Sequence, residues 1–341
     1  MKIIQLTDLH LVPEGQKIHE IDPSQRFEQA LANIKLRHPD LDLLVITGDL
    51  CNDGDTPSYH LLRALLEKYK LNYQLVLGNH DQREPFKGVF PETAIDPHGF
   101  IQSKMQSDGE VYLFLDTLQE GQVAGSYCEK RQDWLRNELK SHLNDPVYVF
   151  LHHPPFKVGM KEMDNCNLAD GEILGEILNT HANVKHLFCG HLHRPLHGVW
   201  RGIPFSCQPS TVHQFTFTTE NLPFQLIKEP PIYSVITSSD WGMVVHQHQY
   251  LEEAERLIKY CLFENQIYLT DINRLVEEFL WQVNSGEKQY ETVNELLIEV
   301  GKGTVKPTTI IQPSYPHKNL NDVDYTLPKS IEDGGKSSKY Y

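Results

Sequence analysis

The pentapeptide Leu77-Gly78-Asn79-His80-Asp81 follows a short apolar run, residues 73–76, that is typical of a β-strand. Gly78 allows the backbone to turn sharply where this strand ends. An amide, an imidazole and a carboxylate then follow one another along the chain. Because ligands bind at the carboxyl ends of strands in α/β sheets, this stretch predicts a functional site. The alternative is a turn whose Asn and Asp side chains cap the backbone.

Strand-like and helix-like segments alternate over the first eighty residues. Apolar runs at 2–6, 41–46 and 73–76 have the composition of buried strands, and apolar residues at helical spacing lie at 24–37 and 58–69. A β-α-β-α-β order of this kind predicts a largely parallel sheet with helices packed on it.

Polar side chains recur at the ends of five predicted strands. In chain order they are Asp8 and His10, Asp49, Asn79 and His80, His152 and His153, and His191 and His193. Each group alone could belong to a turn or to an exposed strand edge. Because all five lie at the same end of the inferred sheet, together they predict one site.

The residue types in this set predict a centre with two metal ions. Carboxylate oxygens mixed with imidazoles suit Mn²⁺, Fe or Zn²⁺. His191 and His193 are two positions apart in an extended segment and point to the same side, so each can reach one of two neighbouring ions. Two ions, divalent or of mixed valence, can lower the pKa of a bridging water and hold both the attacking and the leaving oxygen of a phosphoester.

The motif order D-x-H, G-D, G-N-H-D, H-H-P and G-H-x-H resembles that of the calcineurin-like metallophosphoesterases. The stretches at 207–215 and 230–233 are similar to those of the bacterial class III 3′,5′-cyclic-nucleotide phosphodiesterases of the Icc type. The likeness covers about residues 1–250. It implies an α/β fold, a two-sheet αββα sandwich flanked by helices, in which the hairpins after His193 would build the second sheet.

The resemblance also implies a role for each residue. The ligands of one metal would be Asp8, His10, His193 and a bridging Asp49. The ligands of the other metal would be Asn79, His152, His191 and again Asp49. His80 would stabilise charge on the phosphoryl group or protonate the leaving oxygen. Asp81 would orient His80 or shape the turn, and His153 would either lie in the second shell, behind the ligands, or be structural.

The implied reaction is hydrolysis of a phosphodiester by a metal-bridging hydroxide. A 3′,5′-cyclic nucleotide such as cAMP, converted to the 5′-monophosphate, is the expected substrate. The alternatives are a general phosphodiesterase, a phosphomonoesterase or pyrophosphatase, or a non-catalytic scaffold of the same fold. Thr211 and Gln214, within the stretch that favours a cyclic nucleotide, could equally be ordinary strand residues.

Composition limits the kinds of partner and the cellular compartment that we expect for this chain. A formal charge of −15, from 31 basic and 46 acidic residues, argues against a surface for nucleic-acid polymers or anionic membranes. None of the six cysteines forms a CxxC pair, and we find no apolar stretch of 18 residues. These features predict a cytoplasmic protein with reduced thiols.

Three regions are expected along the chain, a catalytic domain at 1–250, a helical extension at 251–306 and a disordered tail at 307–341. The extension is too small to fold alone, so it is expected to pack on the catalytic domain, on a second copy in a homodimer, or on a partner. Within the catalytic domain, residues 82–109 are rich in Pro, Gly and His. They predict a long loop over the strand ends, either a mobile lid or a rigid crossover.

Overall fold

The computed structural model describes residues 1–217, 223–239 and 242–251. The predicted helical extension and tail lie outside the described residues, and the domain boundaries assigned to them stay predictions. No helix of the described part is long and apolar enough to cross a membrane.

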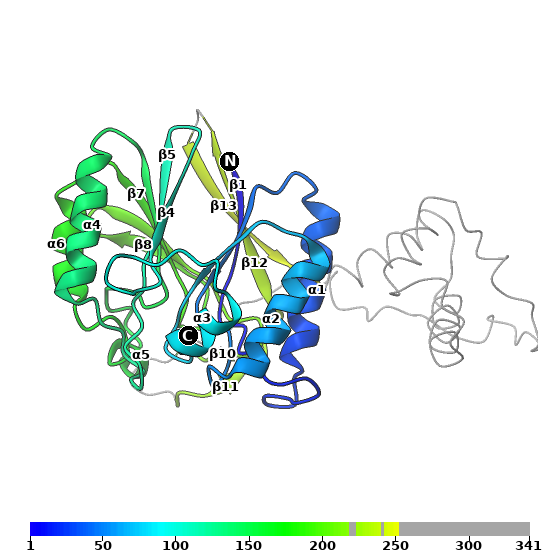
Figure 1. The fold of residues 1–341 in the computed structure, drawn as a ribbon. Helices are drawn as coiled ribbons and strands as arrows, with labels where there is room; N and C mark the ends of the chain where they lie inside the picture. Colours follow the sequence, from blue (N-terminus) through cyan, green and yellow to red (C-terminus); the bar gives the residue numbers. More distant parts are fainter. Residues whose placement is uncertain (218–222, 240–241, 252–341) are drawn as a thin grey trace, which may run out of the picture. The chain divides into compact units, whose positions relative to one another are not determined.

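The first sheet has the strand order β13-β12-β1-β2-β3 (Figure 1). Its strands are β1 (Lys2–Leu6), β2 (Leu43–Thr47), β3 (Tyr73–Val76), β12 (Ile232–Ser239) and β13 (Gly242–Gln249). The connecting helices are α1 (Pro23–Arg37) and α2 (Thr56–Tyr69). Since β1, β2 and β3 run parallel, the predicted β-α-β-α-β order is confirmed.

Local sequence explains where both connecting helices begin. Asp22 caps α1 by accepting hydrogen bonds from the backbone N–H groups of Ser24 and Gln25, and Asp55 caps α2 through the N–H of Ser58. Each helix also has a proline in its first turn, where a missing N–H carries no penalty.

The second sheet has the order β4-β5-β6-β7-β9-β8. Its strands are β4 (Ser103–Ser107), β5 (Glu110–Phe114), β6 (Val147–Phe150), β7 (Val184–Cys189), β8 (Leu196–Trp200) and β9 (Ile203–Cys207). The remaining elements are α3 (Arg83–Val89), α4 (Glu129–Ser141), α5 (Lys161–Asp164), α6 (Gly171–Asn179), and a short antiparallel pair, β10 (Gln214–Phe215) with β11 (Leu226–Ile227).

The expectation that the hairpins after His193 build the second sheet is right for the β8–β9 hairpin and wrong for the β12–β13 hairpin. The β8–β9 hairpin joins a sheet already formed by β4 to β7, and the β12–β13 hairpin pairs with β1 in the first sheet. The reason is that β5, β6 and β7 are parallel strands apolar on both faces, so they need a layer on each side, and the first sheet supplies one of these layers.

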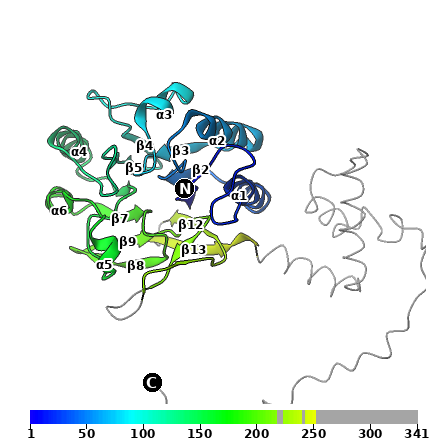
Figure 2. The ribbon, with the colours of Figure 1, turned by 90° about the horizontal axis from the view of Figure 1, so that it is seen from below.

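Three buried layers hold the sandwich together (Figure 2). One core lies between the first sheet and α1, α2 and α3, and a second lies between the second sheet and α4 and α6. The third core, between the sheets, contains stacked rings from three neighbouring strands, Phe114, Phe150 and Phe188. The predicted two-sheet αββα architecture is therefore confirmed.

Residues 82–109 are not the irregular loop that their composition predicts. Their two ends form α3 and the edge strand β4, and only residues 90–102 between them have neither helix nor strand. The segment buries Phe86 and Ile101 in the core of the first sheet. The ring of Phe100 lies between two guanidinium groups, 5.2 Å from that of Arg83 and 4.5 Å from that of Arg131. These contacts favour the rigid crossover over the mobile lid.

Candidate metal centre

Backbone hydrogen bonds join the loops at the strand ends of both sheets. The N–H groups of Asp8 and His10 donate to the carbonyls of Gly48 and Asp49 at 2.9 Å, which ties the loop after β1 to the loop after β2. The N–H of Gly190 donates to the carbonyl of His152 at 3.0 Å, which ties β7 to β6. The predicted site residues therefore meet at one edge of the sandwich.

Two glycines of the sequence motifs are needed because side chains pack directly against their backbone. A Cβ on Gly78 would lie 2.3 Å from Oδ1 of Asp49, and a Cβ on Gly190 would lie 2.1 Å from Oγ1 of Thr7. Gly78 has no left-handed φ. Close approach, rather than the sharp turn inferred from the sequence, is the reason for glycine there.

Gly78→Ala tests this packing. Its methyl group would also come within 2.8 Å of His152 Cε1, so the loops must separate. We expect the free energy of unfolding to fall by about 1–3 kcal/mol and metal binding to weaken. The control is Gly88→Ala in α3, where an added Cβ meets nothing within 4 Å. Chemical denaturation and metal analysis of both variants measure the difference, and equal behaviour would contradict the packing argument.

Five of the seven predicted metal ligands have left-handed backbone conformations. The φ values are 50° for Asp8, 46° for His10, 48° for Asp49, 68° for His191 and 51° for His193. Such conformations cost of order 1–3 kcal/mol each outside glycine and persist where the surrounding structure imposes them. Their concentration here marks the strand ends as a functional region.

Four of the predicted ligands form one buried cluster. They are Asp8, His10, Asp49 and His193, and each offers a ligand atom within 4.8 Å of the others. The Nε2 atom of His193 lies 3.2 Å from Oδ1 of Asp8 and 3.1 Å from Nε2 of His10. The Nδ1 atom of His193 bonds the carbonyl of His213 at 2.9 Å, which orients Nε2 toward the cluster.

The second cluster lies around His152 and His191. Nδ1 of His152 bonds the carbonyl of Thr47 at 2.8 Å, and its Nε2 faces Oδ1 of Asn79 at 3.2 Å. His153 also lies within 4.8 Å of His152 and His191.

Both ring nitrogens of His153 are already occupied. Nδ1 accepts from Thr117 Oγ1 at 2.8 Å, and Nε2 faces the carbonyl of Val123 at 3.1 Å. This geometry is consistent with the second-shell role predicted for His153 and leaves no free nitrogen for an ion.

Asp49 lies between the two clusters. Its Oδ1 accepts from the backbone N–H of His80 at 2.9 Å. Its Oδ2 is 3.4 Å from Nε2 of His152 in one cluster and 3.7 Å from Nε2 of His10 in the other. A carboxylate in this position suits the predicted bridging role.

A buried ligand atom without a partner fits a cation. Within the described residues, Nε2 of His191 is buried and has no hydrogen bond, although such groups are normally paired. Burial lowers the pKa of both His10 and His191 to about 3, so both imidazoles are neutral near pH 7 and offer lone pairs. The donor set therefore fits two divalent ions.

The carboxylates of the centre are anionic despite their burial. Burial raises the pKa of Asp8, but the charges of His193 and His152 lower it more. Burial likewise opposes ionisation of Asp49, yet its pKa is lowered by His152 and His10. In the metal-free protein, His152 holds the matching proton, because Asp49 and Asp8 raise its pKa to about 9 against the effect of burial. A bound cation would take the place of that proton.

The imidazole of His80 is held at the edge of the first cluster. Its Nδ1 lies 2.6 Å from the carbonyl of Asn52, and its ring centroid is 4.7 Å from that of His10. Because Nδ1–H donates to a carbonyl, Nε2 is left for a ligand. His80 therefore lies beside His10, one of the predicted metal ligands.

Of the two roles predicted for Asp81, the structure favours shaping the turn. Its carboxylate accepts from the backbone N–H groups of Gly78, Leu50 and Cys51 and from the hydroxyl of Tyr59. Among the described contacts, none joins it to His80. Asp81 thus connects the loop after β3 to the loop after β2.

The stretch at 208–214 supports the first cluster through side chains and through the carbonyl of His213, a role that its sequence did not predict. Oγ of Ser210 donates to the carbonyl of Asp8 at 2.8 Å, and Gln214 Nε2 donates to the carbonyl of Ser210 at 2.8 Å. The ring of His213 lies 4.5 Å from that of His193.

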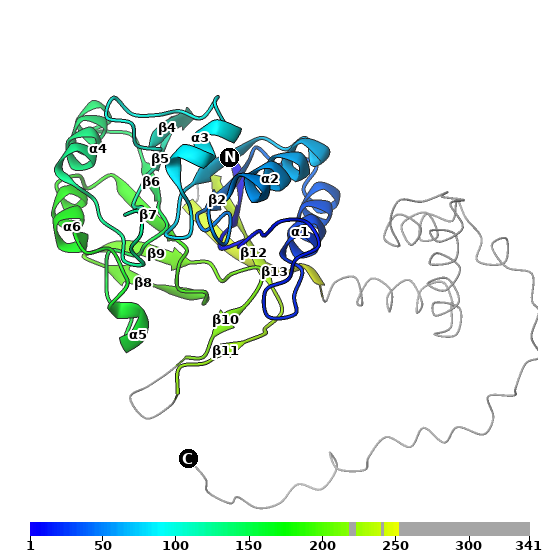
Figure 3. The same ribbon diagram turned by 60° about the horizontal axis from the view of Figure 1, so that its bottom comes forward.

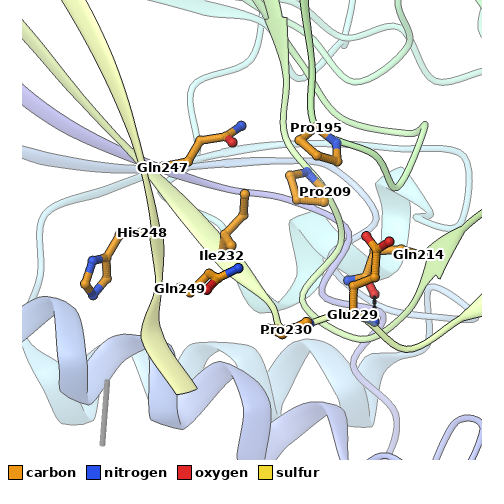
Figure 4. A pocket seen from close by; sticks show the side chains of 9 residues that line it. All are labelled: Pro195, Pro209, Gln214, Glu229, Pro230, Ile232, Gln247, His248 and Gln249. Atoms are coloured by element: carbon orange, nitrogen blue, oxygen red, sulfur yellow. Dashed lines mark hydrogen bonds between the residues drawn. The ribbon is translucent and has the colours of Figure 1, made fainter. Parts of the chain in front are cut away.

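A cavity of about 620 Å³ lies apart from this centre, beside β13 (Figure 4). Its lining residues are Pro195, Pro209, Gln214, Glu229, Pro230, Ile232, Gln247, His248 and Gln249. None of the predicted metal ligands, nor His80, lines it. The reaction site is therefore assigned to the strand ends and not to this cavity.

Comparison with known proteins identifies the family. Residues 1–195 match the family model of the calcineurin-like phosphoesterases. A probable cyclic nucleotide phosphodiesterase of Rhodopseudomonas palustris is 37% identical over 257 residues, which are 74% of this chain and 93% of that protein. A probable glycerophosphodiester phosphodiesterase of Arcobacter nitrofigilis is 28% identical over 72% of this chain and 92% of its own.

Solved structures agree on the fold. A dimetal phosphatase from Danio rerio superposes with a TM-score of 0.57 at 12% identity, covering 73% of this chain and 96% of that one. A purple acid phosphatase from yellow lupin superposes with a TM-score of 0.53 at 12% identity, covering 73% of this chain and 51% of that one. At this identity the likeness establishes the sandwich architecture alone.

Proposed function

We propose that this chain, which belongs to the calcineurin-like phosphoesterase family and is a metal-dependent phosphoester hydrolase, acts on a phosphodiester, namely a 3′,5′-cyclic nucleotide such as cAMP. The product would be the 5′-monophosphate. The support for a diester comes from the charges around the site, and the support for a nucleotide comes from the relatives.

The charges at the strand ends match a substrate with one negative charge. The candidate centre holds two carboxylates, Asp8 and Asp49. In the described part of the chain, no lysine or arginine is hydrogen bonded or ion paired to the seven predicted ligands or to His80. A phosphodiester carries one negative charge, whereas a phosphomonoester or pyrophosphate carries more, so a centre whose ligands have no Lys or Arg partner suits the diester better. This observation carries the proposal of a diesterase.

The names of the relatives differ in the alcohol group of the diester that they give as substrate. The R. palustris protein is named a probable cyclic nucleotide phosphodiesterase, and a protein of Nostoc with that activity in its name is 27% identical over 69% of this chain and 87% of its own. A glycerophosphodiester is the second candidate substrate, favoured by the name of the Arcobacter relative. The higher identity to the R. palustris protein supports the cyclic nucleotide.

The residues that would hold two ions are the predicted ones, Asp8, His10, His193 and Asp49 on one side, and Asn79, His152, His191 and Asp49 on the other. When bound, ions such as Mn²⁺, Fe or Zn²⁺ would supply an activated water and neutralise charge on the phosphoryl group. The carbonyls of His213 and Thr47 bond Nδ1 of His193 and His152, so Nε2 of each ring would be the atom that binds an ion.

His80 would handle the proton of the leaving oxygen. Because its Nδ1 is bonded to the carbonyl of Asn52, the ring cannot turn freely, and Nε2 is the ring nitrogen left for the substrate. Positioning of this kind is what a general acid requires. Asp49 accepts a hydrogen bond from the backbone N–H of His80. This bond would hold the proton donor next to the metal site.

A hydrolysis panel tests the proposal. With Mn²⁺ added, we expect kcat/KM for cAMP to exceed that for 5′-AMP and for pyrophosphate by at least about tenfold, equivalent to about 1.4 kcal/mol in the transition state. The panel should also contain cGMP, a 2′,3′-cyclic nucleotide and a glycerophosphodiester. Faster hydrolysis of the monoester would contradict the charge argument. A higher kcat/KM for the glycerophosphodiester than for cAMP would show that the glycerophosphodiester, and not the cyclic nucleotide, is the substrate.

A further inference from the structure

The β10–β11 hairpin begins beside the metal centre and extends from the edge of the sandwich (Figure 3). It follows His213 directly in the chain. The antiparallel pairing continues beyond the two strands, because Thr216 donates its N–H to the carbonyl of Gln225 at 2.8 Å. The hydroxyl of Thr216 adds bonds to the carbonyl of Pro223 and to the N–H of Gln225. The hairpin is thus ordered over its described length.

A row of rings runs along one face of this hairpin, starting at a predicted metal ligand. The ring of Phe215 stacks on that of His193, with centroids 4.9 Å apart and planes 24° apart. The ring of Phe224 packs on Phe215 at 4.6 Å. The hairpin pairs Phe215 with Leu226, and the bond from Thr216 N–H to the carbonyl of Gln225 continues this register by one pair. Extending the register by one further pair sets Phe217 opposite Phe224, on the face that holds Phe215.

The outer end of the row is exposed. Phe215 and Phe224 are partly buried against the core of the second sheet, which accounts for them as packing residues. Phe217 is 53% exposed. Among the large hydrophobic side chains that the described residues expose, it is the one aromatic ring.

We propose that Phe217, supported by Phe224, is the platform on which the planar base of the substrate stacks while its phosphoryl group lies at the strand ends. The inference rests on the proposed function and assigns a specificity-determining residue to it. Nucleobases stack on aromatic side chains with little regard to base identity. A glycerophosphodiester has no planar group to stack, so this residue would discriminate between the two candidate substrates.

The test compares Phe217→Ala and Phe217→Tyr with wild type, using the full chain and added Mn²⁺. We expect Phe217→Ala to lower the ratio of kcat/KM for cAMP to that for sn-glycero-3-phosphoethanolamine by about 5- to 100-fold, mainly through KM for cAMP, and Phe217→Tyr to keep the ratio near wild type. The matched control is Val199→Ala on β8, which removes a side chain that is 69% exposed. An unchanged ratio in Phe217→Ala would overturn the proposal.

A binding measurement separates failure of this inference from failure of the proposed function. The probe is adenosine 3′,5′-cyclic phosphorothioate, titrated into wild type and Phe217→Ala by calorimetry. A Kd that rises about 5- to 100-fold in the variant supports stacking even if cAMP is not turned over. The same Kd in both proteins, or no binding to wild type, would overturn the stacking role of Phe217, whichever substrate the enzyme hydrolyses. Equal loss for both hydrolysed substrates would instead indicate a structural role.

Discussion

Asp49→Asn is expected to remove both metal ions and to abolish hydrolysis. The carboxylate lies between the two clusters, 3.4 Å from Nε2 of His152 and 3.7 Å from Nε2 of His10. An amide offers one neutral oxygen in place of two anionic ones, so it cannot bridge two cations or balance their charge. Since loss of groups that only orient metal ligands lowers affinity by 10- to 100-fold, loss of the bridge should exceed about 100-fold at both sites.

Metal analysis after dialysis and a phosphodiester assay measure this result. Asp53→Asn is the control, because Asp53 is an exposed carboxylate four residues away. Its side chain accepts a hydrogen bond from Nδ2 of Asn52. It should keep both ions and full activity. Two tightly bound ions together with wild-type activity in Asp49→Asn would rule out the bridging assignment.

His80→Ala is expected to keep both ions and to lose activity by about 10²–10⁴-fold, the range for a positioned acid or base. The variant retains the backbone N–H that donates to Asp49, so the metal site should persist. The loss should appear in kcat and should be smaller for diesters with acidic leaving groups, which need less protonation.

The control for this variant is His60→Ala, which removes an exposed imidazole from α2. Its kinetics should equal those of wild type. If His80→Ala instead loses an ion, or loses the same factor for leaving groups of every acidity, the imidazole is a ligand or a packing residue and not a proton donor.

The pattern of apolar and polar residues along the chain was sufficient to predict the strands that carry the site. Apolar runs that end in Asp, Asn or His predicted β1, β2, β3, β6 and β7 and placed the polar residues at their carboxyl ends. This succeeds because parallel strands end at the same edge of a sheet, so residues far apart in the chain must meet there. The two clusters contain the predicted side chains for this reason, while their individual metal assignments stay predictions.

Local pattern failed where long-range packing decides the outcome. Residues 82–109 look irregular, yet they form α3 and β4 because buried Phe86 and Ile101 and the guanidinium contacts of Phe100 hold them on the sandwich. Likewise, alternation along a hairpin does not say which sheet edge it joins. The β8–β9 and β12–β13 hairpins are assigned to different sheets by pairing with β7 and β1.

The amino-acid sequence by itself determined the family, the chemistry of the donor set and the strand ends that carry it, because side-chain identity and order are local properties. Only the tertiary structure decided that His153 has both ring nitrogens bonded, that Asp81 binds the turn and not His80, and that Gly78 is required by the approach of Asp49. Each of these depends on which backbone atoms come within hydrogen-bond or van der Waals distance after folding, and a pattern along one chain does not encode such distances.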